Sequence, residues 1–169
     1  MHTYQDIDPA NPPGRRIGAF AVIRNEDDDI LLIQPRSRKW WILPGGGVHA
    51  DELPHVACER EVREETGLGI EPVRLLVVDY VPANLATGAA EGYNFVYDGE
   101  VINSGTPIEL QKNELSAYAW VPLKKLATHA RAHTERRIRR AVKALESGRT
   151  AYLVRGEPVT ALDFADPAL

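Results

Sequence analysis

The sequence lacks the features of several large classes of protein. Its single cysteine, Cys58, excludes an intramolecular disulfide and a cysteine-ligated zinc site, and suits a reducing cytoplasm. The formal net charge of −4 provides no general basic field for nucleic acid or an anionic membrane. The longest apolar runs, ILLI and LLVV, are too short to cross a bilayer. We therefore expect a cytoplasmic protein that acts on a small molecule, without a nucleic-acid or membrane partner.

The length suits a single domain. A chain of 169 residues buries roughly two-thirds of its unfolded surface in one core. Residues 1–14 are polar and rich in proline, and they lack the apolar centre of a signal peptide, so we expect a flexible leader there. We expect the domain to occupy residues 15–155 and a C-terminal tail to follow in residues 156–169.

Short apolar runs between turn residues predict strands before and after one central helix. The expected strands are a hairpin in residues 16–36, a short strand at 40–43, strands within 70–81, 91–102 and 115–122, and a terminal strand or hairpin in 150–160. The expected helices cover 53–66, ended by Gly67, and 123–147, with a break near Thr128. This order favours an α/β fold in which helices cover a mixed sheet.

Three glutamates of the central helix share one face. Glu61, Glu64 and Glu65 stand at positions i, i+3 and i+4, and the small residues Ala57 and Cys58 lie beside them on the helical wheel. Like charges at this spacing repel one another, and a divalent cation such as Mg²⁺, which prefers hard oxygen ligands, would remove that repulsion. A solvated acidic surface is the alternative, and the spacing alone does not decide between the two.

The glycines before this helix favour the metal site. Gly45, Gly46 and Gly47 allow backbone to approach a ligand closely, and a loop that leads into a helix N-terminus suits phosphate. A glycine-rich turn can also be only a tight turn. Joined to an acidic helix face, however, it indicates a site for a metal ion and a phosphate.

The stretch from Gly46 to Leu68 resembles the Nudix box, G-x5-E-x7-R-E-U-x-E-E-x-G-U, in which U is an aliphatic residue. The nine fixed positions are all matched, by Gly46, Glu52, Arg60, Glu61, Val62, Glu64, Glu65, Gly67 and Leu68. The segments WILPGGG and NELSAYAWVPLKKL extend the resemblance to residues 17–126. His49 and Asp51 depart from the family, which often has Glu and Gly at these positions, and they alter the charge and shape of the loop.

The resemblance implies the Nudix fold, an α/β/α sandwich with a mixed sheet. It also implies a hydrolase that cleaves a diphosphate bond in a nucleoside diphosphate linked to another moiety, and a homodimer is common among relatives. Mg²⁺, or Mn²⁺, would be held by Glu61, Glu64 and Glu65, with Glu61 either a ligand or the residue that orients water. Gly46 would allow the loop to close.

The same resemblance assigns supporting roles. Arg60 would organise the carboxylates by ion pairing, and Glu52 would fix the loop or contribute to the outer metal shell. The general base is a box glutamate in some relatives and a glutamate on a later loop in others. The loop candidate is Glu114, six residues before Trp120, and Glu109 is a weaker one; an ordinary polar residue before a strand is the alternative reading of Glu114.

Residues outside the box carry weaker signals. Arg36 and Arg38 precede the glycines and would suit substrate phosphates, although a solvated basic turn is equally compatible with them. Alternation sends Trp40 and Trp41 to opposite faces of a strand, one into the core and the other available to stack on a base.

A basic run follows in residues 131–140. His129 and His133 have a spacing that can hold a metal ion, yet no HExxH pattern accompanies them, so we expect both to be exposed to solvent. The apolar Ile138 within the run favours an amphipathic surface helix over an RNA-binding segment.

The substrate stays open at this level. Pro82 lies near a position where ADP-ribose-cleaving relatives often carry proline, which hints at a nucleotide sugar such as ADP-ribose. Nucleoside triphosphates, dinucleoside polyphosphates and non-nucleotide diphosphates are alternatives. A catalytically silent module that senses a nucleotide is the rival function, and the intact carboxylate set argues against it.

Overall fold

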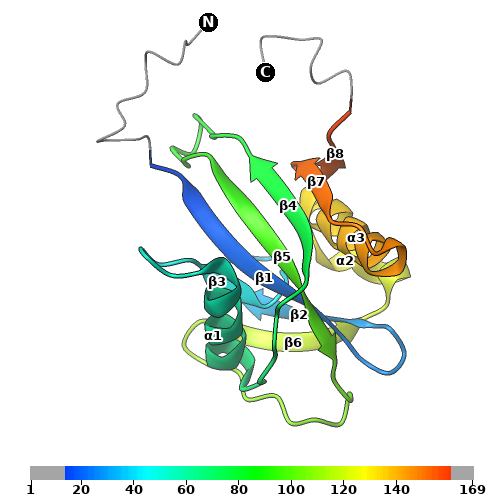
Figure 1. The fold of residues 1–169 in the computed structure, drawn as a ribbon. Helices are drawn as coiled ribbons and strands as arrows, with labels where there is room; N and C mark the ends of the chain where they lie inside the picture. The colour runs from blue at the N-terminus through cyan, green and yellow to red at the C-terminus, as the bar shows by residue number, and fades with distance from the viewer. Residues whose placement is uncertain (1–13, 161–169) are drawn as a thin grey trace, which may run out of the picture.

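The computed structural model describes residues 14–160 and contains one mixed sheet of eight strands (Figure 1). The strand order is β6-β2-β1-β5-β4-β7-β8, and β3 pairs with β1 outside that path. The strands are β1 Arg16–Arg24, β2 Ile30–Pro35, β3 Gly45–Gly47, β4 Leu75–Val81, β5 Gly92–Val101, β6 Leu115–Val121, β7 Ala151–Val154 and β8 Glu157–Pro158. The helical segments are α1 Pro54–Thr66, the 3-10 turn η2 Leu123–Lys125, α2 Leu126–His129 and α3 Ala132–Ser147. Residues 1–13 of the expected leader lie outside the described part of the chain.

Two hydrophobic clusters lie on opposite faces of the sheet. Successive side chains of a strand point to opposite faces, so Ala21 and Ile23 of β1 join a cluster with α1, whereas Val22 joins a cluster with α3. The strands β1 and β5, and β4 and β7, pair in parallel, and the other pairs are antiparallel. The prediction of a mixed sheet between helices is therefore confirmed.

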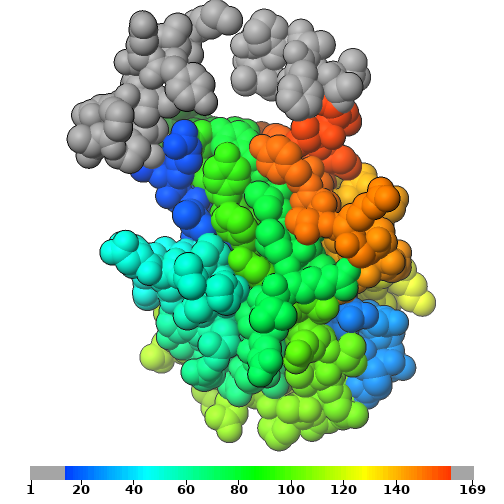
Figure 2. Space-filling model, viewed as in Figure 1, coloured from blue at the N-terminus to red at the C-terminus, as the bar shows by residue number. Residues whose placement is uncertain are grey.

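The helices occupy separate sides of the molecule. In Figure 1, α1 lies beside β1 and β3, and α3 lies at the other end of the sheet beside β7. In the space-filling view, the surface of α1 (teal) and that of α3 and β7 (orange) are separated by residues of β4 and β5 (green) (Figure 2). No helix within residues 14–160 is long and apolar enough to cross a membrane.

The central helix begins and ends as its sequence predicts. Leu53 is the extended N-cap, Pro54 occupies the first turn, and Gly67 closes the helix in the left-handed conformation with φ of 73°. The Gly67 amide donates to the Arg63 carbonyl. This sharp exit fixes the helical register of the three glutamates, and Cys58 packs in the cluster beneath α1, where burial raises the pKa of its thiol to about 12.

One of the predicted strands is wrong. Residues 40–43 form no strand; Ile42 makes a single bridge to Ile33, and the strand is formed by the glycines that follow. The free edge of β1 explains this result, because glycines without side chains can lie flat against it.

The predictions for the C-terminal elements agree with the structure. The helical segment breaks at residues 130–131, close to the break predicted near Thr128. The hairpin predicted in residues 150–160 is formed by β7 and β8. Residues 161–169 of the expected tail lie outside the described part of the chain.

Candidate active site

The glycine strand β3 lies between β1 and the acidic face of α1. Gly45 has φ of 132°, and a Cβ there would lie 2.6 Å from the Phe20 Cα. A Cβ on Gly46 would lie 2.5 Å from the carboxyl carbon of Glu61. Glycine is required at both positions, because any side chain would displace either β1 or the Glu61 carboxylate.

Glu65 is the most buried of the three box carboxylates. Its side chain accepts a hydrogen bond of 2.8 Å from the Gly45 amide, and the residue is 7% exposed. Burial raises the pKa of Glu65 to about 8, and the nearby charges of Glu61, Glu114 and Glu64 raise it further against the hydrogen bond from Gly45. Three glutamates, one of them outside the box, therefore lie close enough to act electrostatically on Glu65.

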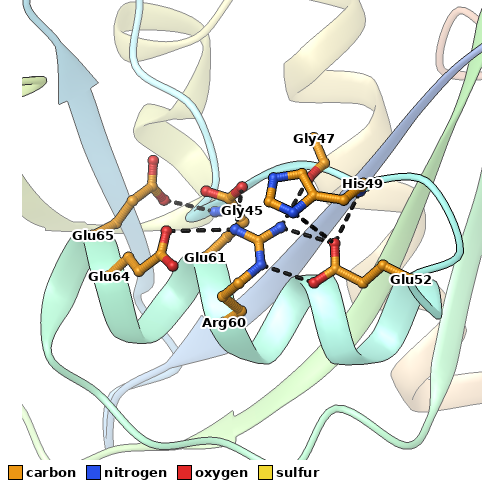
Figure 3. Close-up of polar contacts among 8 residues, drawn as sticks. All are labelled: Gly45, Gly47, His49, Glu52, Arg60, Glu61, Glu64 and Glu65. Atoms are coloured by element: carbon orange, nitrogen blue, oxygen red, sulfur yellow. Dashed lines mark hydrogen bonds and ion pairs between the residues drawn. The ribbon is translucent and has the colours of Figure 1, made fainter.

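Arg60 lies at the centre of the box and contacts its carboxylates (Figure 3). Its guanidinium binds Glu52 in a bidentate manner, with Nε to Oε1 at 2.8 Å and Nη2 to Oε2 at 2.9 Å. Nη1 donates to Glu61 at 2.8 Å and to Glu64 at 3.4 Å. Nη2 also donates to the carbonyl of Gly47 at 3.1 Å. One side chain thus joins three carboxylates to the glycine strand.

Glu52 ties the loop between β3 and α1 to that arginine. The Arg60 guanidinium and the His49 amide, which donates at 2.9 Å, lower the pKa of Glu52 to about 2. Asp51 has φ of 61°, the left-handed conformation that glycine adopts without strain and that Asp tolerates better than most residues. The departure from the family's usual glycine at this position is thereby accommodated, because the backbone conformation is the one that glycine favours.

The carboxylates have suitable chemistry for a divalent cation. Within residues 14–160, no three acidic, histidine or cysteine side chains converge into a ready-made metal cage. Arg60 occupies one oxygen each of Glu61 and Glu64, and the Gly45 amide occupies one of Glu65. The second oxygen of each of these three glutamates has no hydrogen-bond partner in the described chain. Such a set of hard oxygen donors fits Mg²⁺ or Mn²⁺.

A cleft of about 1190 Å³ opens beside these residues, on the sheet face that α3 covers. Of the residues predicted from the sequence, those that line the cleft are Arg36, Arg38, Gly45, Gly46, Gly47, Glu65 and Glu114. Four others do not line it and lie on α1 or its preceding loop: Glu52, Arg60, Glu61 and Glu64. The cleft wall also contains four further arginines, at positions 15, 16, 137 and 155. The wall is therefore strongly basic although the whole chain is acidic.

The structure separates the two candidate loop glutamates. Glu114 lines the cleft, and its carbonyl accepts a bond of 2.7 Å from the Arg36 amide. Glu109 is exposed beside Gly67 at the far end of α1, where its amide donates to Thr66 at 2.8 Å. Only Glu114 is placed to act in the cleft.

The two tryptophans lie outside any strand, so the alternation predicted for them does not apply. Trp41 packs against the α3 cluster and contacts His129 edge-on, while Trp40 lies under the Lys39 ammonium. Both rings line a small cavity of about 180 Å³ that adjoins the cleft. The expectation that His129 and His133 are solvent-exposed is wrong, because both are half-buried and His133 lines the cleft.

The sequence reasoning missed the far wall of the cleft. His133, Thr134 and Arg137 of α3, and Arg155 of the turn between β7 and β8, all line it. These residues are brought there by the packing of α3 and β7 beside β4. One periodic signal was present, because Thr134 and Arg137 precede the buried Ile138 on the same helix face.

Comparisons with known proteins agree with this architecture. The family model described as the NUDIX domain matches residues 14–142. The 8-oxo-dGDP phosphatase of Mus musculus is 36% identical over 121 residues, which is 68% of this chain and 34% of that protein. The RNA pyrophosphohydrolase of Xanthomonas campestris is 41% identical over 66 residues, which is 39% of this chain and 32% of that protein. The chain thus spans about a third of the length of these curated relatives.

The solved structures show the same fold. The MutT protein of Methanosarcina mazei superposes with a TM-score of 0.66 and 28% identity, over 78% of this chain and 96% of that one. The NUDIX domain of Shewanella oneidensis NrtR, complexed with ADP ribose, has a TM-score of 0.65 at 18% identity, over 83% of this chain and 95% of that one. The second likeness supports the fold alone.

Proposed function

This chain belongs to the NUDIX domain family, and from that premise we propose that it is a divalent-metal-dependent pyrophosphohydrolase. Its substrate is a nucleoside diphosphate linked to another moiety, such as a nucleotide sugar, or a nucleoside triphosphate. One observation carries the proposal: the buried Glu65 lies at the cleft, bonded to the Gly45 amide, among the charges of Glu61, Glu64 and Glu114. Repelling carboxylates beside a basic cleft suit a metal ion and a phosphorylated substrate.

Glu61, Glu64 and Glu65 would hold the metal ion, because each has a carboxylate oxygen that Arg60 and Gly45 leave unbonded. When bound, Mg²⁺ or Mn²⁺ neutralises charge on the phosphoryl oxygens and favours ionisation of the attacking water. Arg60 keeps the carboxylates in position, because its guanidinium is itself fixed by Glu52 through two hydrogen bonds.

The other cleft residues act as the general base or bind substrate phosphate. Glu114 takes the proton of the attacking water as general base, since it lines the cleft close enough to raise the pKa of Glu65. Glu61 is the alternative base within the box. Arg36 is held by a bond of 2.7 Å from its Nε to the Lys112 carbonyl, which directs its other guanidinium nitrogens to substrate phosphate. The Arg38 guanidinium has no partner within residues 14–160, and it also binds substrate phosphate.

The named relatives support the reaction class. The curated ones are called an 8-oxo-dGDP phosphatase and an RNA pyrophosphohydrolase, and both names describe attack on phosphorus. They differ in substrate, so they do not choose between a nucleotide sugar and a nucleoside triphosphate. A cytoplasmic location and a homodimer are kept as expectations from composition and from the family resemblance.

A substrate panel tests the proposal directly. Purified protein with Mg²⁺ is incubated with nucleotide sugars, nucleoside di- and triphosphates, oxidised nucleotides and dinucleoside polyphosphates, and the products are identified to show which bond breaks. We expect cleavage within the diphosphate of at least one class. Saturable binding without any phosphate-containing product would instead make the chain a nucleotide-sensing module.

Glu64→Gln tests the carboxylate set. Removing one charged ligand from the metal site lowers kcat by about 100-fold or more, the magnitude that removal of one strong electrostatic contact to the reacting group costs. The matched control is Glu59→Gln, a change on the same helix at a residue that pairs with Arg63 instead. A Glu64→Gln variant with full turnover would refute the metal role of that residue.

A further inference from the structure

The first turn of α3 meets the cleft on the wall opposite the carboxylates. Ala132 begins this helix of 16 residues, and the N-cap Arg131 provides no side-chain cap. The amides of Ala132, His133 and Thr134 have no acceptor within residues 14–160, while the next amide, of Glu135, already bonds to the Arg131 carbonyl at 2.9 Å. Of these three residues, His133 and Thr134 line the cleft, so this part of its wall is the positive end of the helix dipole with unbonded amides.

Thr134 adds a hydroxyl to these amides. The residue is 8% exposed and lines both the main cleft and the adjoining cavity. Its hydroxyl makes no hydrogen bond in the described chain, and the oxygen itself is not fully buried. The hydroxyl is therefore open to the cleft, where a bound phosphate can accept its hydrogen bond.

Arg137 lies one turn further along the same helix face. Its Nε donates to Asp79 at 2.6 Å, and the fully buried Asp79 also accepts the Gly156 amide at 2.9 Å. The two Nη groups of Arg137 have no acceptor among residues 14–160, and the side chain lines the cleft. The guanidinium is thus fixed along one edge and free along the other.

The surroundings favour an anion in spite of the Asp79 charge. Burial lowers the pKa of His133, and the charges of Arg137 and Arg131 lower it further against the effect of Asp79. The adjoining cavity is lined by two more arginines, Arg38 and Arg131, beside the two tryptophans. A further positive charge is disfavoured here, and a negative one is favoured.

We infer that the first turn of α3 is a phosphate-binding subsite, in which the free amides, the Thr134 hydroxyl and the Arg137 guanidinium bind one phosphate group of the substrate. This inference deepens the proposed function and rests on it. The bound phosphate is a further one, separate from the diphosphate that is cleaved. Glu65 and Thr134 line the same cleft but belong to different helices, α1 and α3, which pack on opposite faces of the sheet. The substrate class is a nucleotide that carries an additional phosphate on its nucleoside or on its linked moiety.

A binding experiment tests the subsite without any catalysis. The full-length protein in EDTA is titrated with inorganic phosphate, and tryptophan fluorescence reports binding because Trp40 and Trp41 line the adjoining cavity. We expect saturable binding that weakens at least 5-fold in Thr134→Val, because that variant loses one hydrogen bond to a charged group. Thr134→Ser retains the hydroxyl and the affinity. Thr128→Val, at an exposed threonine of α2, is the matched control.

Protein stability separates binding from folding in this experiment. The Thr134 hydroxyl has no partner in the described chain, so Thr134→Val should unfold at the same temperature as the parent or higher. Unchanged phosphate affinity in that variant would overturn the subsite.

A kinetic experiment decides which phosphate is bound. Coenzyme A and dephospho-coenzyme A, and likewise NADPH and NADH, differ by one phosphate outside the diphosphate. Thr134→Val should raise KM about 5-fold more for the member with the extra phosphate than for the other member. Equal increases for both members would overturn the placement, because the subsite would then hold the diphosphate itself. If no compound is cleaved, the proposed function fails, and the titration still decides the subsite.

Discussion

The two walls of the cleft are built from very different lengths of chain. Apart from Glu114, the carboxylate wall comes from one segment, residues 45–65, in which helical spacing and a glycine turn determine the arrangement. The opposite wall is built around Asp79 of β4. This residue bonds to Arg137 of α3, 58 positions away, and to Gly156 of the turn between β7 and β8, 77 positions away. A short motif thus carries the general chemistry of the reaction, whereas the residues that face the rest of the substrate depend on the complete fold.

The two walls also differ in how their arginines are held. Arg60 shares its charge among Glu52, Glu61 and Glu64 in a partly solvated position. Among residues 14–160, Arg137 has one acidic partner, Asp79, and both are buried. When one partner of a buried ion pair is removed, water cannot solvate the charge that is left. Loss of a charge from the opposite wall should therefore lower the free energy of unfolding more than loss of a charge from the carboxylate wall.

The largest effect is expected when that buried pair is broken. Asp79→Asn removes the countercharge of Arg137 without changing the shape of the site, and should lower the free energy of unfolding by about 3 kcal/mol or more. Urea denaturation measures this loss. Metal binding by the variant, measured under conditions where it is folded, should be close to that of the parent, because the carboxylate wall is not touched.

An exposed ion pair between α3 and β8 serves as the control. Arg136 and Glu157 approach to 2.7 Å with side chains 38% and 58% exposed. Glu157→Gln should change the free energy of unfolding by no more than about 1 kcal/mol. Equal losses in the two variants would show that burial does not distinguish the pairs, and would remove the energetic contrast between the walls.

The next largest effect is expected on kcat, from a change in the carboxylate wall. Gly46→Ala places a methyl group 2.5 Å from the Glu61 carboxyl carbon, so the carboxylate must move. We expect kcat to fall about 100-fold, since displacement of a catalytic group by about 1 Å costs this much. Gly47→Ala is the control one residue away, where a new Cβ meets nothing within 4 Å. Steady-state kinetics of both variants measures the difference, and equal rates would show that the glycine strand does not set the position of Glu61.

The same contrast explains which parts of the structure were predictable from sequence. Helical periodicity is a local property, so the shared face of Glu61, Glu64 and Glu65 and the end of α1 at Gly67 followed from spacing alone. Residues 40–43 did not form the expected strand, because strand formation depends on a free neighbouring edge that lies elsewhere in the chain.

Only part of the cleft wall formed by α3 could be predicted from the sequence. Thr134 and Arg137 share a helix face with Ile138 and Ala141, and this spacing indicates that they point inward. The basic run around them suggested a solvated surface instead. Identifying Asp79 as the partner of Arg137 requires the packing of α3 against β4, which spacing along the chain does not contain.

The smallest effect is expected from substitutions of Asp51. They test whether the stability of the carboxylate wall depends on the backbone conformation at this position. With φ of 61°, Asp51 is in a conformation that costs a residue with a Cβ about 1 kcal/mol and costs glycine little. Asp51→Gly should therefore raise the free energy of unfolding by no more than about 1 kcal/mol, and Asp51→Ala should not raise it. Thermal unfolding gives the stabilities, and kcat should be the same in both variants, because Glu52 and Arg60 hold the loop through their own bonds. A large change in kcat with little change in stability would mean that the charge of Asp51 matters to the reaction. The carboxylate wall would then contain a catalytic contribution that the spacing of the box residues in the sequence does not predict.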